Sequence, residues 1–273
     1  MKRVITAFKE HKEFKRKKHW DANILRFQTE IVTPPHYADT VEIIVNHGAV
    51  GDIHIGGKHC KVTDHLAYYI PPNAVHSIEY QKSDGYVSVL KINHLTLKQY
   101  LDLESVLEGC GHSFESLPYY IDDPDVVGSI ERTYFESESI FTVLTSTLGF
   151  FKWLTELGES QPETFAAHRS DDIRRIIEWS EQNFTDSPTL EEAAAVFGYN
   201  KNYFCQKFKA ETGVTYVSYL NCLRINYACA QLKKGLSVTE VCYSCGFENP
   251  SYFIKLFRTM VGITPRKYAA GGE

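Results

Sequence analysis

From Thr189 the chain reads TLEEAAAVFGYNKNYFCQKFKAETGVTYVSYL, and from Ser237 it reads SVTEVCYSCGFENPSYFIKLFRTMVGITPRKYA. The glycines Gly198 and Gly246 lie 48 positions apart, and after a one-residue insertion the separation becomes 49. At that second separation several residues of the first copy recur in the second: Tyr203, Phe204, Phe208, Gly213, Thr215 and Tyr219. The chain therefore contains one small pattern written twice.

Each copy carries the local signals of a helix-turn-helix unit. Thr189 and Ser237 stand three positions before Glu192 and Glu240, which is the capping box that starts a helix. A small apolar helix then ends at a glycine, because glycine adopts the left-handed conformation that a tight interhelical turn requires. A second helix follows the turn and buries two phenylalanines four positions apart. Its other face is left free to read a partner.

These residues resemble the DNA-binding domain of the AraC/XylS transcription regulators, which holds two such motifs. The resemblance is strongest in GFENPSYFIKLFRTMVGITPRKY, from Gly246 to Tyr268. It implies a DNA-binding domain at 170–273 with motifs at 189–211 and 237–260, and it implies promoter DNA and RNA polymerase as partners. The alternative is a helical bundle with no role on DNA.

The resemblance places base-reading side chains on the exposed face near the start of each second helix. These candidates are Asn202, Cys205, Gln206, Asn249, Ser251, Ile254 and Lys255. Gln206 can pair with adenine, Lys255 can donate to guanine, and Ile254 can contact a thymine methyl group. Cys205 replaces the longer polar side chain often found at its position, so we expect weak reading there.

Cations beside these helices are suited to DNA phosphates, which position a protein without specifying sequence. They are Lys201, Lys207, Lys209, Arg258 and Arg224. Pairing inside the helical domain is the alternative for Arg224. The span from Thr215 to Lys234 reads as one helix of roughly 30 Å, close to the ~34 Å turn of B-DNA, so it can set both reading helices on one side of a duplex.

Charge and composition bound the remaining chain. Residues 1–169 carry 17 basic and 23 acidic side chains, whereas 170–273 carry 12 and 11. The sequence has no apolar run of about 18 residues, so we expect no membrane helix. Seven cysteines fit a reducing cytoplasm better than a disulfide framework. The pair Cys242 and Cys245 resembles a redox or zinc motif, but it falls on a small buried helix face and beside the turn glycine.

Residues 1–94 predict an antiparallel β-barrel or sandwich, because short β-type runs alternate with turn residues. The runs lie at 24–27, 41–45, 52–55, 59–62, 66–70, 76–80 and 87–92. Gly56-Gly57 predicts a hairpin turn. The segments 36–48, 52–62 and 69–78 resemble the cupin-type sensor domain of many AraC/XylS regulators. The implied fold class is α+β and multidomain, with a cupin-like, double-stranded β-helix barrel before the all-helical DNA-binding domain.

The cupin resemblance implies a small-molecule site in the barrel, with His36, Glu42, Tyr69 and His76 as candidate pocket residues. Cupin enzymes hold a metal with a His-x-His pair, a glutamate and a later histidine. Here Ala38 takes the second position of that pair, so we expect an effector pocket with no metal and no cofactor. A barrel with no small ligand is the third alternative, and the effector itself is not encoded in these residues.

Residues 95–157 show helical periodicity, and 125–157 suffice for one or two helices. In relatives of this layout such helices pair two subunits, so we expect a homodimer, with packing on the barrel as the alternative. The polar segment 158–169 is the predicted linker. We interpret the chain as a cytoplasmic regulator and not an enzyme. The alternatives are a metal-dependent cupin enzyme with an appended DNA-binding module, and a ligand-independent regulator switched by a partner protein. Activation and repression both stay open.

Overall fold

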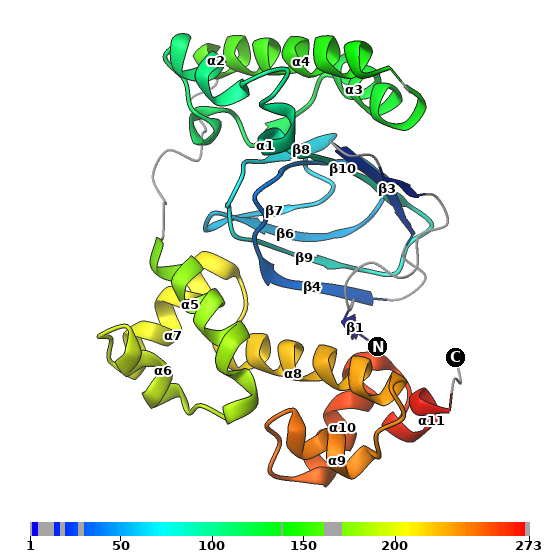
Figure 1. The fold of residues 1–273 in the computed structure, drawn as a ribbon, viewed down its shortest axis with the longest axis vertical. Coiled ribbons are helices and arrows are strands. Elements are labelled where there is room, and N and C mark those ends of the chain that lie inside the picture. The colour runs from blue at the N-terminus through cyan, green and yellow to red at the C-terminus, as the bar shows by residue number, and fades with distance from the viewer. Residues whose placement is uncertain are drawn as a thin grey trace.

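The computed structural model describes residues 2–4, 14–16, 20–26, 30–137, 139–160 and 171–270 of the 273-residue chain. Within these ranges an N-terminal part built of β-sheets lies between a group of helices and a helical C-terminal part (Figure 1). The predicted α+β organisation is therefore confirmed.

In the described part of the chain the strands form two sheets. One is antiparallel and runs in the order β11 (Tyr120–Ile121), β8 (Ala67–Ile70), β5 (Val41–His47), β10 (Tyr86–Ile92), β3 (Trp20–Arg26) and β2 (Phe14–Arg16). The other runs in the order β1 (Lys2–Val4), β4 (Glu30–His36), β9 (His76–Tyr80), β6 (Gly51–Ile55) and β7 (Lys58–Lys61). In this second sheet β1 is parallel to β4, and the other pairs are antiparallel.

The predicted β-type runs all overlap strands of the described residues. Gly56 and Gly57 have φ of 53° and 83° and join β6 to β7, which confirms the predicted hairpin. Strand β4 was not predicted, because it contains Pro34 and Pro35, which have no N–H to donate. Its pairing with β9 is correspondingly irregular between Thr33 and His36.

A closed barrel was predicted, but the strand pairs of the described residues do not join the two sheets into one. The sheets instead share a buried apolar layer. Ile53 and Ile78 from one sheet belong to the same core cluster as Ile44 and Val89 from the other. Alternate residues of β5 and β9 therefore face an interior between the sheets.

Helices α3 (Pro124–Glu136) and α4 (Ile140–Ser160) cover the outer face of the sheet that contains β5 and β10 (Figure 1). Val127 and Phe151 from these helices share a second core cluster with Ile43 and Leu90 of that sheet. The short helices α1 (His94–Leu97) and α2 (Leu103–Gly109) lie at the same side. Helix α4 extends into the predicted linker, and the linker from residue 161 onward lies outside the described residues.

The C-terminal part comprises α5 (Asp171–Asn183), α6 (Leu190–Val196), α7 (Lys201–Thr212), α8 (Tyr216–Lys233), α9 (Val238–Ser244), α10 (Pro250–Val261) and α11 (Pro265–Ala269). Two separate apolar cores lie along α8. Tyr216 and Leu220 belong to the core with α5, α6 and α7, whereas Ile225 and Leu232 belong to the core with α9 and α10. None of the helices in the described ranges is long and apolar enough to cross a membrane.

Candidate nucleic-acid interface and buried polar cluster

Both predicted capping boxes are present. The Thr189 hydroxyl accepts a hydrogen bond from the Glu192 N–H at 3.1 Å, and the Glu192 carboxylate accepts one from the Thr189 N–H at 2.8 Å. At the second copy, Ser237 and Glu240 make the same reciprocal pair at 3.3 and 3.0 Å. Each box satisfies backbone donors that the first turn of a helix leaves without partners, and so fixes where α6 and α9 begin.

The turn glycines have the left-handed conformation that was predicted, with φ of 71° at Gly198 and 79° at Gly246. Each turn directs the following helix across the preceding one. The predicted phenylalanine pairs, Phe204 with Phe208 and Phe253 with Phe257, are all fully buried. The two copies are therefore two helix-turn-helix units, α6–α7 and α9–α10, joined by α8.

Most predicted base readers lie on exposed surface of α7 and α10. Exposed members are Asn202, Gln206, Asn249, Ser251, Ile254 and Lys255, whereas Cys205 is half-buried. Asn249 also caps α10, because its side-chain oxygen accepts hydrogen bonds from the N–H groups of Ser251 and Tyr252 at 2.9 and 3.1 Å. Its amide nitrogen is the part left for a base.

Two of the predicted phosphate-binding lysines on α7 are ion-paired within the protein. Lys201 lies 2.7 Å from the Glu191 carboxylate, and Lys207 lies 2.7 Å from the Glu211 carboxylate. Both lysine ammonium groups have a raised pKa. The hydrogen bond to Glu191 is the main cause of the raised pKa of Lys201, while for Lys207 the pair with Glu211 outweighs the opposing effect of burial. Part of the positive charge of α7 is therefore already balanced.

The other predicted phosphate-binding residues differ from one another. Lys209 and Arg258 are exposed. Arg224 is half-buried on α8, where its Nε donates to the Phe184 carbonyl at 3.1 Å and its guanidinium lies 5.6 Å from the Phe247 ring centroid. Arg224 therefore holds parts of the domain together in this structure.

Helix α8 sets the separation of the two units. Its 18 residues correspond to about 27 Å at 1.5 Å per residue. It is buried at both ends against different cores, which makes it a rigid spacer rather than a hinge. Its length approaches the ~34 Å that separates successive major-groove faces of B-DNA.

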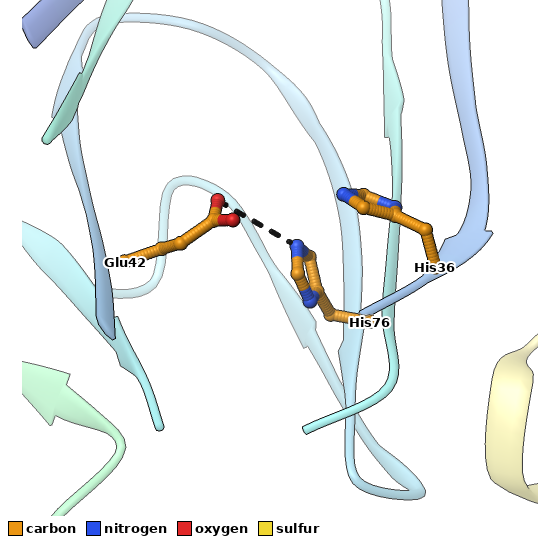
Figure 2. Close-up of side chains that lie close together, drawn as sticks. All are labelled: His36, Glu42 and His76. Carbon is orange, nitrogen blue, oxygen red and sulfur yellow. Dashed lines mark ion pairs between the residues drawn. The ribbon is translucent and has the colours of Figure 1, made fainter. Parts of the chain in front are cut away.

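A polar cluster lies inside the N-terminal sheets. His36 from β4, Glu42 from β5 and His76 from β9 point toward one another (Figure 2). One potential metal-ligand atom from each side chain lies within 4.8 Å of the others, and His76 Nε2 is 3.8 Å from Glu42 Oε2. Glu42 and His76 are each only 2% exposed. The cluster is therefore shielded from solvent.

Backbone carbonyls fix the tautomers of both histidines. His36 Nδ1 donates to the Pro34 carbonyl at 2.9 Å, and His76 Nδ1 donates to the Ala74 carbonyl at 3.0 Å. Because a carbonyl only accepts, Nδ1 carries the hydrogen and Nε2 keeps its lone pair. Burial, together with neighbouring His36, lowers the pKa of His76 to about 3, and burial also lowers the pKa of His36. Both imidazoles are neutral near pH 7.

Lys91 on β10 completes the surroundings of Glu42, with its Nζ 2.6 Å from Glu42 Oε1. Burial alone raises the pKa of this carboxyl, but the charges of Lys91 and the histidines outweigh it and hold the pKa below its ordinary value. Glu42 is therefore an ionised carboxylate whose second oxygen faces His76.

The fourth predicted pocket residue, Tyr69, does not join this cluster. It lies on the opposite face of the sheet, in the core shared with α4, where its hydroxyl donates to the Phe114 carbonyl at 3.3 Å. Glu42 and Tyr69 come from neighbouring strands, but Glu42 pairs with Ile70 and not with Tyr69, so Tyr69 points to the other side.

Residues 193–271 match a family described as a helix-turn-helix domain. The HTH-type transcriptional activator RhaS of Escherichia coli O139:H28 is 26% identical over 256 residues, which cover 88% of each chain. RhaS of Enterobacter sp. strain 638 is 26% identical over 272 residues, again covering 88% of each chain. These matches support the predicted resemblance to the AraC/XylS regulators.

Solved structures give a looser likeness. ToxT from Vibrio cholerae is 14% identical, covers 93% of this chain and 98% of its own, and has a TM-score of 0.49. The DNA-binding domain of AdpA, solved in complex with a target DNA, is 27% identical over 37% of this chain and 93% of its own, with a TM-score of 0.36. Both scores lie below 0.5, so no function follows from them.

The N-terminal part contacts the helical domain directly, at α7 of the first helix-turn-helix unit and at α5. The Ser77 hydroxyl of β9 donates to the carbonyl of Thr212, the last residue of α7, at 2.7 Å. The Tyr37 hydroxyl donates to the Glu178 carboxylate of α5 at 2.6 Å. Burial and this hydrogen bond raise the pKa of Tyr37 to about 12, so its proton stays in place near pH 7.

Tyr37 and Ser77 directly follow the two clustered histidines in sequence, and no local sequence pattern predicts their contacts. Successive side chains of a strand point to opposite faces, so His76 faces the sheet interior while Ser77 faces the helical domain. Lys91 was also missed. The sequence did contain a signal for it: Lys91 follows buried Val87 and Val89 at two-residue spacing on β10, which places it on the same inward face.

Proposed function

We propose that this chain is an AraC/XylS-type transcription regulator that reads adjacent major grooves of promoter DNA with α7 and α10. One observation carries the proposal: two capped helix-turn-helix units present exposed polar faces from the ends of one buried, continuous helix. The matched relatives named above are transcriptional activators. We propose no catalytic role for the chain, and RNA polymerase is its expected partner at the promoter.

Base reading follows from the exposed positions. On α7, Asn202 and Gln206 offer amides, and Gln206 can make a bidentate pair with adenine. On α10, Lys255 can donate to guanine and Ile254 can contact a thymine methyl. Lys209 and Arg258 are suited to phosphates beside these bases.

Sensing is assigned to the N-terminal sheets. We propose that the two facing sheets are the halves of a cupin-like barrel and that a small-molecule effector reaches His36, Glu42 and His76. A ligand shifts an equilibrium only if it binds one state better than another. The contacts of Tyr37 with α5 and of Ser77 with α7 are placed to transmit such a shift, because they adjoin the site on one side and the helical domain on the other.

A homodimer in the cytoplasm is the expected working form. Phe141 is 77% exposed and Leu148 is 41% exposed, and the two residues lie seven positions apart on one face of α4. The inner face of the same helix is buried on the sheet. We propose that this exposed stripe of α4 contributes to the subunit contact.

The test is a selection of bound fragments from the source genome with purified full-length protein at moderate salt. We expect a shared asymmetric motif of about 17 to 20 base pairs with two blocks one helical turn apart. Recovery of no common motif by the protein, under salt conditions where it does bind DNA, would falsify sequence-specific reading.

Substitutions then distinguish side chains that contact bases from side chains that contact phosphates. Gln206→Ala and Lys255→Ala should each change the relative affinities among motif variants by about 1–3 kcal/mol at one base position. Lys209→Ala should weaken binding to all variants alike and reduce the salt slope by about 1. Lys82→Ala, which removes an exposed lysine between β9 and β10, is the matched control and should alter neither quantity.

A further inference from the structure

The cluster of His36, Glu42 and His76 gathers acceptor atoms around one point. Both Nδ1 atoms donate to carbonyls, so both rings turn an Nε2 lone pair inward, and Glu42 adds the oxygen that Lys91 does not bind. Lone pairs that converge in a buried place are costly unless a donor or a cation lies between them. The geometry therefore suits an occupant that accepts electron pairs.

We propose that His36, Glu42 and His76 bind one divalent transition-metal ion and that this ion sets how firmly the sheets hold the first helix-turn-helix unit. The regulatory part rests on the proposed function. Two imidazoles and one carboxylate suit zinc or iron(II) and disfavour magnesium and calcium, which prefer oxygen ligands. Three protein ligands suffice for such an ion, so the alanine at position 38 does not preclude a site.

The dimensions allow the ion to enter with small side-chain movements. Ligand atoms about 2.0–2.2 Å from an ion lie roughly 3–4 Å from one another. The distance of 3.8 Å between His76 Nε2 and Glu42 Oε2 already falls in that range, and the whole set lies within 4.8 Å. The carbonyls of Pro34 and Ala74 orient the rings, as outer partners of metal-bound histidines commonly do.

Lys91 limits the charge balance of the site. Its ammonium already offsets the Glu42 carboxylate, so a divalent ion keeps a net positive charge. The open positions of the ion therefore favour an anionic oxygen donor, which names the chemical class of a co-ligand. The same reasoning predicts that Lys91→Met raises metal affinity, because it removes a repelling charge.

The proposed metal site is directly connected to the contacts with the helical domain. His36 and His76 are each followed by the residue that contacts the helical domain, Tyr37 and Ser77. An ion that draws His36 and His76 together restrains β4 and β9 at the positions from which those contacts leave. Metal binding should therefore change the equilibrium between held and released α7.

The binding test uses full-length protein dialysed free of metal and titrated with Zn²⁺ or Co²⁺ alone, with Co²⁺ absorption reporting nitrogen and oxygen ligation. We expect one equivalent bound, weakened by about 100-fold or more in His76→Gln and His36→Gln. Thermal unfolding of the metal-free variants establishes that they fold. His59→Ala removes an exposed histidine paired with Asp52 and should bind like the parent. No binding by the parent, or binding that survives both glutamine variants, overturns the proposal.

The regulatory test measures affinity for the selected DNA motif with and without Zn²⁺. We expect a change of about fivefold or more in the parent, which shrinks toward none in Ser77→Ala. Metal bound at the site with identical DNA affinity overturns the regulatory part and leaves the DNA-binding function standing. Failure to recover any motif refutes the proposed function, and the Co²⁺ titration still decides the metal site.

Discussion

The two helix-turn-helix units have the same local design but different surroundings. The first unit shares its core with Val75 of the N-terminal sheets, and its lysines pair with Glu191 and Glu211. In the second unit the turn glycine Gly246 packs against residues 184–187, and β1 lies beside helix α10 (Figure 1). The same caps, turn glycines and phenylalanine pairs thus give both units the same local structure, while contacts between residues distant in sequence give each unit different packing partners. The first contacts β9 and Val75, and the second contacts residues 184–187 and β1.

The largest expected difference concerns the turn glycines. A Cβ added at Gly246 would lie 2.8 Å from the carbonyl oxygens of Phe184 and Thr185, whereas one added at Gly198 would meet nothing within 4 Å. Both glycines have a positive φ, so both alanine variants carry strain of about 1–2 kcal/mol. Gly246→Ala adds a clash with backbone, and we expect its loss of unfolding free energy to reach about 3–4 kcal/mol.

Urea denaturation of the two glycine variants in parallel provides the measurement, with the unfolding slope checked for two-state behaviour. Equal losses in both variants would mean that the backbone of residues 184–185 shifts to accept the new methyl group without lowering the free energy of unfolding further. The comparison between the units would then have to rest on charge alone.

Arg224 gives the next largest effect, because it joins the two units. Arg224→Met removes a hydrogen bond to Phe184 and the contact with the Phe247 ring, and we expect a loss of about 2 kcal/mol. The salt slope of DNA binding should not change. Arg258→Ala on the exposed face of α10 should do the opposite, leaving stability unchanged and lowering the slope by about 0.9.

The features that the sequence predicts depend on residues close together in the chain, whereas the features that it misses depend on contacts between residues far apart. The capping boxes, turn glycines and phenylalanine pairs depend on neighbours within four positions, so the sequence alone predicts them. Strand β4 depends on its partner β9, which overrides the two prolines inside it. The contact of Ser77 with Thr212 spans 135 positions, and no local pattern marks it.

The buried cluster lies between these extremes. The cupin resemblance was enough to select His36, Glu42 and His76. The same resemblance also selected Tyr69, which the structure places on the opposite face of the sheet, because the register between neighbouring strands sets which way each side chain points. Lys91 was likewise not predicted, because only the register between β10 and β5 places it opposite Glu42.

A smaller effect is expected where the first unit meets the sheets. Ser77→Ala removes the hydrogen bond to the Thr212 carbonyl, and we expect a loss of about 1 kcal/mol. Hydrogen exchange should become faster around residues 212–214 at the end of α7 and stay unchanged around 261–263 at the end of α10. Ser129→Ala, which alters an exposed serine of α3, is the control. Faster exchange at both helix ends would show that the units are not held separately.

The smallest effect tests the balanced charge of α7. Glu191→Gln should release Lys201 from its 2.7 Å ion pair with little change in stability, because both groups are exposed. The released ammonium can then neutralise a phosphate, so the salt slope of DNA binding should rise by up to about 0.9. Loss of any acidic group near DNA also raises affinity, so the informative measurement is the double variant. In a Lys201→Ala background the slope should no longer respond to Glu191→Gln. If it still rises by the same amount, the carboxylate acts by general repulsion, and the two reading helices do not differ in the way that the ion pairs indicate.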